Sequence, residues 1–130
     1  MSVKSGPAKE DRMRMVIAAV VAMMISAAMA DELEDARRLA VAGRDSYWKC
    51  LAREYPRDSN KRMSGEDFAS HLASVCASER QNFRVALMGY LSMQSPGTDV
   101  GAPLTTANNA IALAQKDIVT AFIKHRDASK

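Results

Sequence analysis

Apolar residues recur at three- and four-residue steps over most of the chain after residue 30, a pattern typical of helices that bury one face. Pro56 then removes a backbone donor and stops a helix. The pattern therefore predicts a first helix over residues 31–55. Its small and apolar positions are Leu33, Ala36, Ala40, Gly43, Tyr47, Cys50 and Leu51.

A second stripe begins after Ser64, whose side chain can cap a helix, and Met63 can pack on Phe68 across that start. The stripe continues for about seven turns and only Glu79 interrupts it. We therefore expect one unbroken second helix from Ser64 to about Leu91. Its apolar members are Phe68, Leu72, Val75, Cys76, Phe83, Ala86, Leu87, Tyr90 and Leu91.

A third helix is predicted to begin near Thr105 or Thr106, either of which can act as its cap. Its stripe is rich in alanine, so we expect it to lie in the groove between the first two helices and to cover Val41, Trp48 and Tyr55. No segment alternates β-branched and polar residues as a strand does. The sequence therefore predicts an all-α fold, a three-helix bundle.

The first thirty residues have the pattern of a cleaved secretory signal peptide. A basic stretch through Arg14 precedes the apolar run Met15–Ala27, and Ala28-Met29-Ala30 offers small residues at a cleavage site. The run is shorter than the ~20 residues of a membrane-spanning helix, although a retained anchor is the alternative. We expect a helical domain of residues 31–130 without a stable transmembrane segment, in the periplasm or secreted.

Charge narrows the class of partner. Residues 31–130 hold 14 basic and 13 acidic side chains, so the domain carries a charge of only +1. A surface that neutralises many phosphates needs a larger excess of basic residues. We therefore expect no nucleic acid among its partners.

Cys50 and Cys76 are the only cysteines, and an exported chain with two cysteines typically joins them in one disulfide. Their spacing does not fit a C-x-x-C redox loop, a haem-attachment site or a zinc knuckle. A redox-active or metal-bound pair is the alternative. His71 lies about 140° from Cys76 on a helix, which argues against shared metal ligation, and we expect no metal or cofactor.

A bridge between these cysteines also predicts how the first two helices face each other. In an antiparallel hairpin, facing positions have residue numbers that sum to about 126. Small residues of the first helix then meet large ones of the second. The expected pairs are Tyr47 with Glu79, Gly43 with Phe83, Ala40 with Ala86, and Ala36 with Tyr90.

Glu79 lies within an apolar stripe, where a carboxylate must be exposed, paired or functional. The expected partners on the facing helix are Arg44 and Lys49. A catalytic acid would need a second acid, a base or a nucleophile on a compatible face, and the sequence offers no such set. We therefore expect no catalytic residue and no enzyme activity.

Trp48, Glu79, Arg80 and Arg84 are the candidate surface for a ligand or a partner. Arg80 and Arg84 lie one turn apart on the second helix, near a basic loop that follows Pro56. Mixed charge of this kind is typical of a solvated helix end, and it can also contact an anionic membrane or cell-wall surface.

The segment from Tyr47 to Leu91 resembles small exported proteins of proteobacteria with two cysteines and a helical fold, largely uncharacterised. The resemblance rests on Tyr47-Trp48-Lys49-Cys50-Leu51, Cys76-Ala77-Ser78-Glu79-Arg80 and the run from Phe83 to Leu87. It implies a periplasmic location and transfers no catalytic residue.

The function these observations favour is a non-enzymatic exported protein that presents a helical surface to another macromolecule, an envelope protein or a cell-wall component. The alternative is a carrier that holds a small apolar ligand between its helices. Its aromatic lining would be Tyr47, Trp48, Phe83 and Tyr90.

Overall fold

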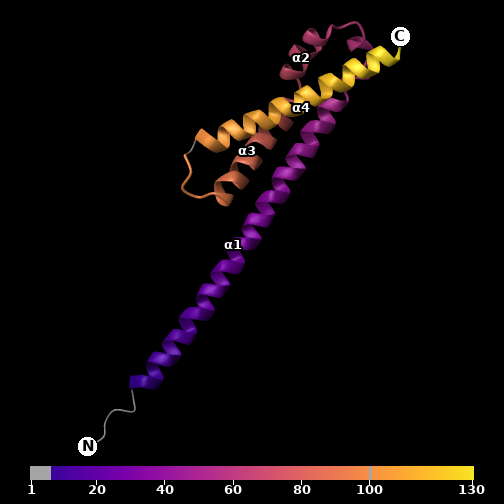
Figure 1. Ribbon diagram of the computed structural model, residues 1–130. Helices are drawn as coiled ribbons and strands as arrows, with labels where there is room; N and C mark the ends of the chain where they lie inside the picture. The colour runs from indigo at the N-terminus through magenta and orange to yellow at the C-terminus, as the bar shows by residue number, and fades with distance from the viewer. Residues whose placement is uncertain (1–6, 100) are drawn as a thin grey trace, which may run out of the picture. The chain divides into compact units, whose positions relative to one another are not determined.

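The computed structural model describes residues 7–99 and 101–130, with side chains from residue 27 onward, and this part of the chain is helical without strands (Figure 1). Four α-helices and one short 3-10 helix alternate with turns. The elements are α1 (Pro7–Ala52), η1 (Asp58–Asn60), α2 (Gly65–Ser74), α3 (Ala77–Gln94) and α4 (Gly101–Ala128). The all-α class is confirmed.

The chain divides into two compact units, residues 1–35 and residues 36–130. The predicted signal peptide falls in the first unit, and residues 1–6 at its start lie outside the described residues. Cleavage after Ala30 stays a prediction. Within the described part of the chain, none of the helices combines the length and the apolar content that crossing a membrane requires.

The predicted disulfide and the Gly43–Phe83 pair of the predicted register are confirmed, and the other three expected pairs stay predictions. Cys50 and Cys76 form a disulfide, with their Cα atoms 6.1 Å apart. A Cβ atom added to Gly43 would lie 3.0 Å from the Cα atom of Phe83. Residue numbers therefore fall along α1 as they rise along α3, as a sum of 126 requires.

The prediction of one unbroken second helix was wrong. The described part of the chain has two helices, α2 and α3, in its place, and so four α-helices where three were expected. Ser64 does cap α2, since its hydroxyl accepts a hydrogen bond from Asp67 N at 3.1 Å. However, α2 ends at Ser74, and Cys76 has left-handed backbone geometry with φ of 58°. For a residue other than glycine this geometry costs about 1 to 2 kcal/mol.

Packing explains the break at Cys76. Phe68 of α2 packs on Phe122 of α4, whereas Arg84 of α3 reaches Asn108, almost four turns earlier on the same helix. Figure 1 shows α2 and α3 beside different stretches of α4. The change of direction lets both segments bury apolar side chains.

The ends of two other helices also differ from the prediction. α1 ends at Ala52, because the following residues form a turn in which Arg53 N bonds to Cys50 O. α4 begins at Gly101 rather than at Thr105 or Thr106. Pro103 fits the first turn of a helix because no backbone donor is needed there, and Thr105 bonds back to the carbonyl of Gly101.

The core lies where α2, α3 and α4 meet the end of α1. Phe68 stacks on Phe122 with ring centroids 3.9 Å apart. Tyr55 is covered as predicted, by the ring of His125 on α4, whereas Trp48 remains 45% exposed. The expectation that this helix covers Trp48 was therefore wrong. The largest fully buried side chains are Tyr47, Leu51, Phe68, Leu72, Ile118 and Phe122.

Candidate functional site

An open groove lies between α1 and α4, with a volume of about 400 Å³ in its first segment. The deepest lining residues are Phe83 and Ala114, which are buried. Trp48 of α1 and Leu113 of α4 are the large apolar side chains at its sides, 45% and 59% exposed. The charged lining residues are Arg44, Asp45 and Lys49 from α1 and Asp117 from α4.

A second segment of about 330 Å³ continues the groove, because Arg44, Phe83 and Ala110 line both segments. Along α1 the groove runs from Arg37 to Lys49, which corresponds to about 18 Å of helix. The remaining lining residues of the second segment are Ala40, Val41, Leu87 and Tyr90. The groove is therefore elongated and largely apolar.

The four aromatic residues of the predicted ligand carrier fall into two groups. Tyr47 and Phe83 belong to the core, since Tyr47 is fully buried and Phe83 is 4% exposed. The Tyr47 hydroxyl accepts a hydrogen bond from Gln115 at 2.9 Å. Trp48 and Tyr90 instead line different segments of the groove.

Arg80 and Arg84, two residues of the candidate surface, bind other parts of the same chain. The Arg80 guanidinium donates to the carbonyl of Ala73 at 2.6 Å and so satisfies the end of α2. Arg84 donates to Asn108 on α4 at 3.1 Å and to Gln81 at 2.6 Å. Both arginines therefore connect helices.

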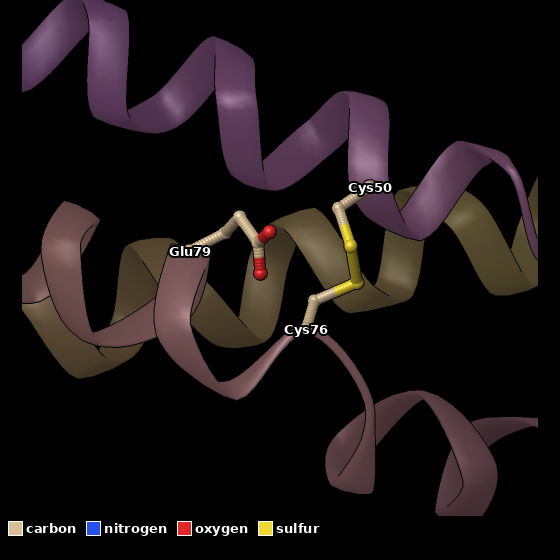
Figure 2. Close-up of side chains that lie close together, drawn as sticks. All are labelled: Cys50, Cys76 and Glu79. Atoms are coloured by element: carbon tan, nitrogen blue, oxygen red, sulfur yellow. A yellow bond between two sulfur atoms is a disulfide. The ribbon is translucent and has the colours of Figure 1, made fainter.

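Glu79 faces the disulfide. Figure 2 shows its carboxylate directed toward the bond between Cys50 and Cys76, and one ligand atom from each of the three residues lies within 4.8 Å of the others. Among the described residues, neither Arg44 nor Lys49 forms the expected ion pair with Glu79, and Arg44 instead pairs with Asp45 at 3.1 Å. Two thiolates and a carboxylate can hold zinc, but here the two sulfurs are bonded to each other.

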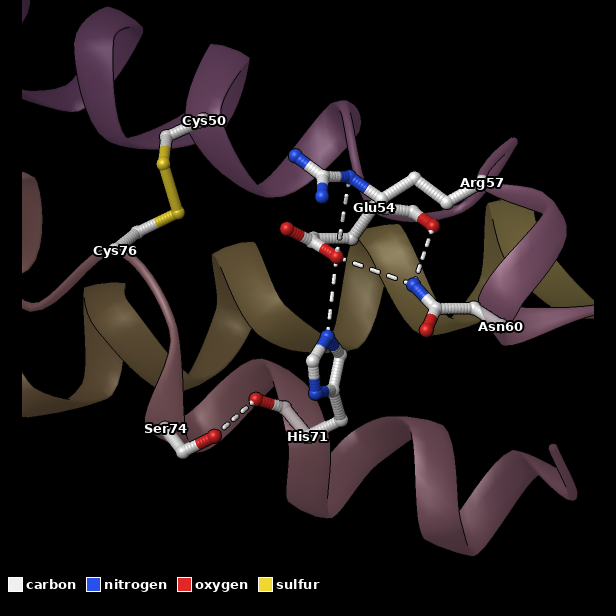
Figure 3. Close-up of polar contacts among 7 residues, drawn as sticks. All are labelled: Cys50, Glu54, Arg57, Asn60, His71, Ser74 and Cys76. Carbon is white, nitrogen blue, oxygen red and sulfur yellow. Dashed lines mark hydrogen bonds and ion pairs between the residues drawn. A yellow bond between two sulfur atoms is a disulfide. The ribbon is translucent and has the colours of Figure 1, made fainter.

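A buried polar network lies on the other side of the disulfide, around Glu54 (Figure 3). Glu54 is 8% exposed, and its carboxylate accepts hydrogen bonds from His71 Nε2 at 3.0 Å and from Asn60 Nδ2 at 3.1 Å. Arg57 adds an ion pair at 3.6 Å. The network therefore joins the loop after α1 to α2.

Burial raises the pKa of Glu54, but the hydrogen bonds from His71 and Asn60 and the positive charge of Arg57 together outweigh this effect. The pKa of Glu54 consequently lies below its ordinary value of 4.5. The carboxylate is held in its charged form.

The Glu54 network lacks the geometry of a nucleophile activated by a histidine. Ser74 is near, but its hydroxyl donates to the backbone carbonyl of His71 at 2.7 Å and not to the ring (Figure 3). A triad requires the hydroxyl to bond to the imidazole. The arrangement therefore connects elements of the fold.

Sequence reasoning missed this network. Glu54 and His71 are 17 positions apart, on opposite sides of a predicted loop, and no periodicity relates them. The one available signal was Arg57 three residues after Glu54, a spacing that brings opposite charges together within a helical turn.

No known protein family matches this chain, and neither a characterised protein nor a solved structure matches it. The resemblance of Tyr47–Leu91 to exported two-cysteine proteins therefore stays a prediction.

Proposed function

We propose that this protein is an exported, non-enzymatic binding protein whose groove between α1 and α4 takes an amphipathic helix of another protein, one of the cell envelope. The observation that carries the proposal is the open apolar groove itself, about 18 Å long and bounded by two helices. A helix that docks in such a groove buries an apolar face of about three turns.

The side chains in the groove favour a helix over other occupants. Small residues, Ala40, Ala110 and Ala114, line it and let a partner backbone approach closely. Trp48 and Leu113 flank that strip and can close around large apolar side chains of the partner. Tryptophan is enriched among the residues that dominate binding energy at protein interfaces.

Charge gives the partner an orientation. Arg44 and Lys49 lie along the α1 side of the groove, and Asp117 lies on the α4 side. The Arg44–Asp45 pair is half-exposed and such pairs contribute little, so Arg44 can exchange its partner at low cost. The complementary helix carries acidic residues on the flank that meets α1.

Site-specific photo-crosslinking tests the proposal. A crosslinking amino acid replaces Leu113 in the groove and, as a control, Leu39, which is 66% exposed and lines neither groove segment. We expect position 113 to crosslink one amphipathic segment of an envelope protein. A synthetic peptide of that segment should then change Trp48 fluorescence and bind more weakly to the Lys49→Glu variant.

Equal labelling from both positions, or a captured peptide without effect on Trp48, would contradict the proposal. The small-ligand carrier makes a different prediction, namely that a fluorescent fatty acid, an apolar probe, changes Trp48 emission in the absence of any peptide. That result, with no effect of the peptide, would favour the carrier.

A further inference from the structure

The Cys50–Cys76 disulfide joins two half-buried cysteines, and it lies beside the Glu79 carboxylate, which has no ion pair among the described residues. Figure 2 shows the Glu79 side chain extending from the first turn of α3 toward the bond. A reagent that reaches either sulfur therefore meets the charge of Glu79 at close range.

We propose that Glu79 is a specificity-determining residue of this disulfide, which selects against anionic thiols as reagents that open it. The inference is independent of the groove and of its occupant. Its basis is the placement of one negative charge within 4.8 Å of both sulfurs.

Opening the bond requires an external thiol, which is the reductant. Its thiolate attacks one Sγ, a bond forms between the two sulfurs, and the other Sγ leaves with the electron pair of the broken bond. A second external thiolate then attacks the mixed disulfide at the reagent's sulfur. The products are two protein thiols, after protonation by water, and one molecule of oxidised reagent.

Negative charge is present at the reacting sulfurs throughout the first step. The Glu79 carboxylate therefore raises the barrier for every thiolate, and it raises the barrier further for a reagent that carries an additional negative charge. A reagent with a positive charge offsets the repulsion. Because this effect acts through charge, dissolved salt weakens it.

Neighbouring basic residues do not cancel this charge by direct contact. The Arg80 guanidinium lies at the carbonyls of Ala73 and Val75, where it completes the end of α2. Lys49 is exposed, and no ion pair joins it to Glu79 in the part of the chain that the structure describes. If Lys49 dominated the local field, anionic thiols would be the faster reagents.

The test is the rate at which three thiols open the disulfide of the oxidised full-length protein. Cysteamine, mercaptoethanol and mercaptoethanesulfonate provide a positive, a neutral and a negative reagent, compared at equal thiolate concentration. We expect the wild-type protein to react fastest with cysteamine and slowest with the sulfonate. Free protein thiols are trapped by alkylation and counted by mass.

The Glu79→Gln variant should react about three- to tenfold faster with the sulfonate at low salt, less so with mercaptoethanol and least with cysteamine. High salt should reduce these differences. The Glu79→Lys variant should react still faster with the sulfonate than Glu79→Gln does. Glu66→Gln, which removes an exposed carboxylate of α2 outside this cluster, should leave the rates unchanged.

Equal acceleration of all three reagents in Glu79→Gln would overturn the proposal, because it would indicate looser packing rather than lost charge. Unchanged rates, or a wild-type protein that reacts fastest with the anionic thiol, would overturn it as well.

Discussion

The core is closed on the side of α2 and open on the side of the groove. Beside α2, Phe68 stacks on Phe122 and Leu72 is fully buried, and the Glu54 network satisfies the polar groups of the adjoining loop. Beside the groove, Phe83 is buried but Trp48 and Leu113 are left half-exposed or more. The same pair of helices, α1 and α4, borders both sides.

The difference between the two sides is due to α2, a helix of ten residues. α2 supplies Phe68 and Leu72 and closes the core along the C-terminal half of α4. No described element closes the groove beside Trp48 in the same way. The α2 side is therefore the more completely closed, and the groove side leaves apolar surface exposed, which is where the proposed partner helix would bind.

Truncating one aromatic residue on each side gives the largest expected contrast. Phe122→Ala removes a stacked, buried ring and should lower the free energy of unfolding by about 3 to 5 kcal/mol. Trp48→Ala removes a half-exposed ring and should cost less than about 1 kcal/mol. Denaturant unfolding of the oxidised protein measures both. Equal losses would contradict the division into a stable side and a binding side.

Removing the disulfide tests whether the two sides depend on one covalent connection. The double variant Cys50→Ala, Cys76→Ala should lose roughly 3 to 4 kcal/mol of stability, since the bond closes a loop of 26 positions in the unfolded chain. Reduction of the wild-type protein should lower its melting temperature correspondingly. Equal stability of the double variant would show that the bridge does not stabilise the fold.

Lowering the pH should reduce the stability of the α2 side, because the Glu54 carboxylate becomes protonated. Because its pKa is lower in the folded protein, Glu54 contributes stability above pH 4.5, and this contribution is lost as the pH falls through the folded pKa. Glu54→Gln should cost roughly 1 to 2 kcal/mol at neutral pH and less in strong acid. Unfolding at several pH values measures this change. A loss that stays constant with pH would indicate that charge is not its cause.

Two glycine substitutions test close packing with the smallest effects. A Cβ at Gly43 would lie 3.0 Å from the Phe83 backbone, so Gly43→Ala should cost about 1 to 2 kcal/mol despite the better helix propensity of alanine. Gly89 has no atom within 4 Å of its added Cβ, and Gly89→Ala should stabilise α3 by about 0.5 to 1 kcal/mol. Thermal unfolding compares them. Stabilisation by both would contradict the close contact of α1 with α3.

The sequence alone predicts the helical class, one helix cap and one contact between distant residues. Helical periodicity predicts the all-α class, and the cysteine pair predicts the Gly43–Phe83 register, which the small residues of α1 support independently. The type of side chain at Ser64 and the apolar residues on either side of it, Met63 and Phe68, predict the cap of α2. These features depend on residue spacing or on the presence of two cysteines, both of which are visible in the sequence.

The remaining features depend on tertiary packing. The break at Cys76 follows from the need of Phe68 and Phe83 to reach different parts of the core, and no glycine or proline marks it. The groove likewise results from the arrangement of the helices. Trp48, which the sequence predicts to be covered by the third helix, lies instead at the side of the groove. Periodicity assigns residues to faces but does not tell how completely a neighbour covers each face.

The disulfide also fixes how the protein responds to mechanical force. When the chain is pulled from its two ends, the segment between Cys50 and Cys76 carries no tension once the surrounding structure opens, because the S–S bond bypasses it. The stretched chain is therefore about 90 Å shorter than it would be without the disulfide. The bypassed segment contains α2 and the polar contacts of Asn60 and His71, so α2 is shielded from the applied force, whereas Phe122, its stacking partner on α4, is not.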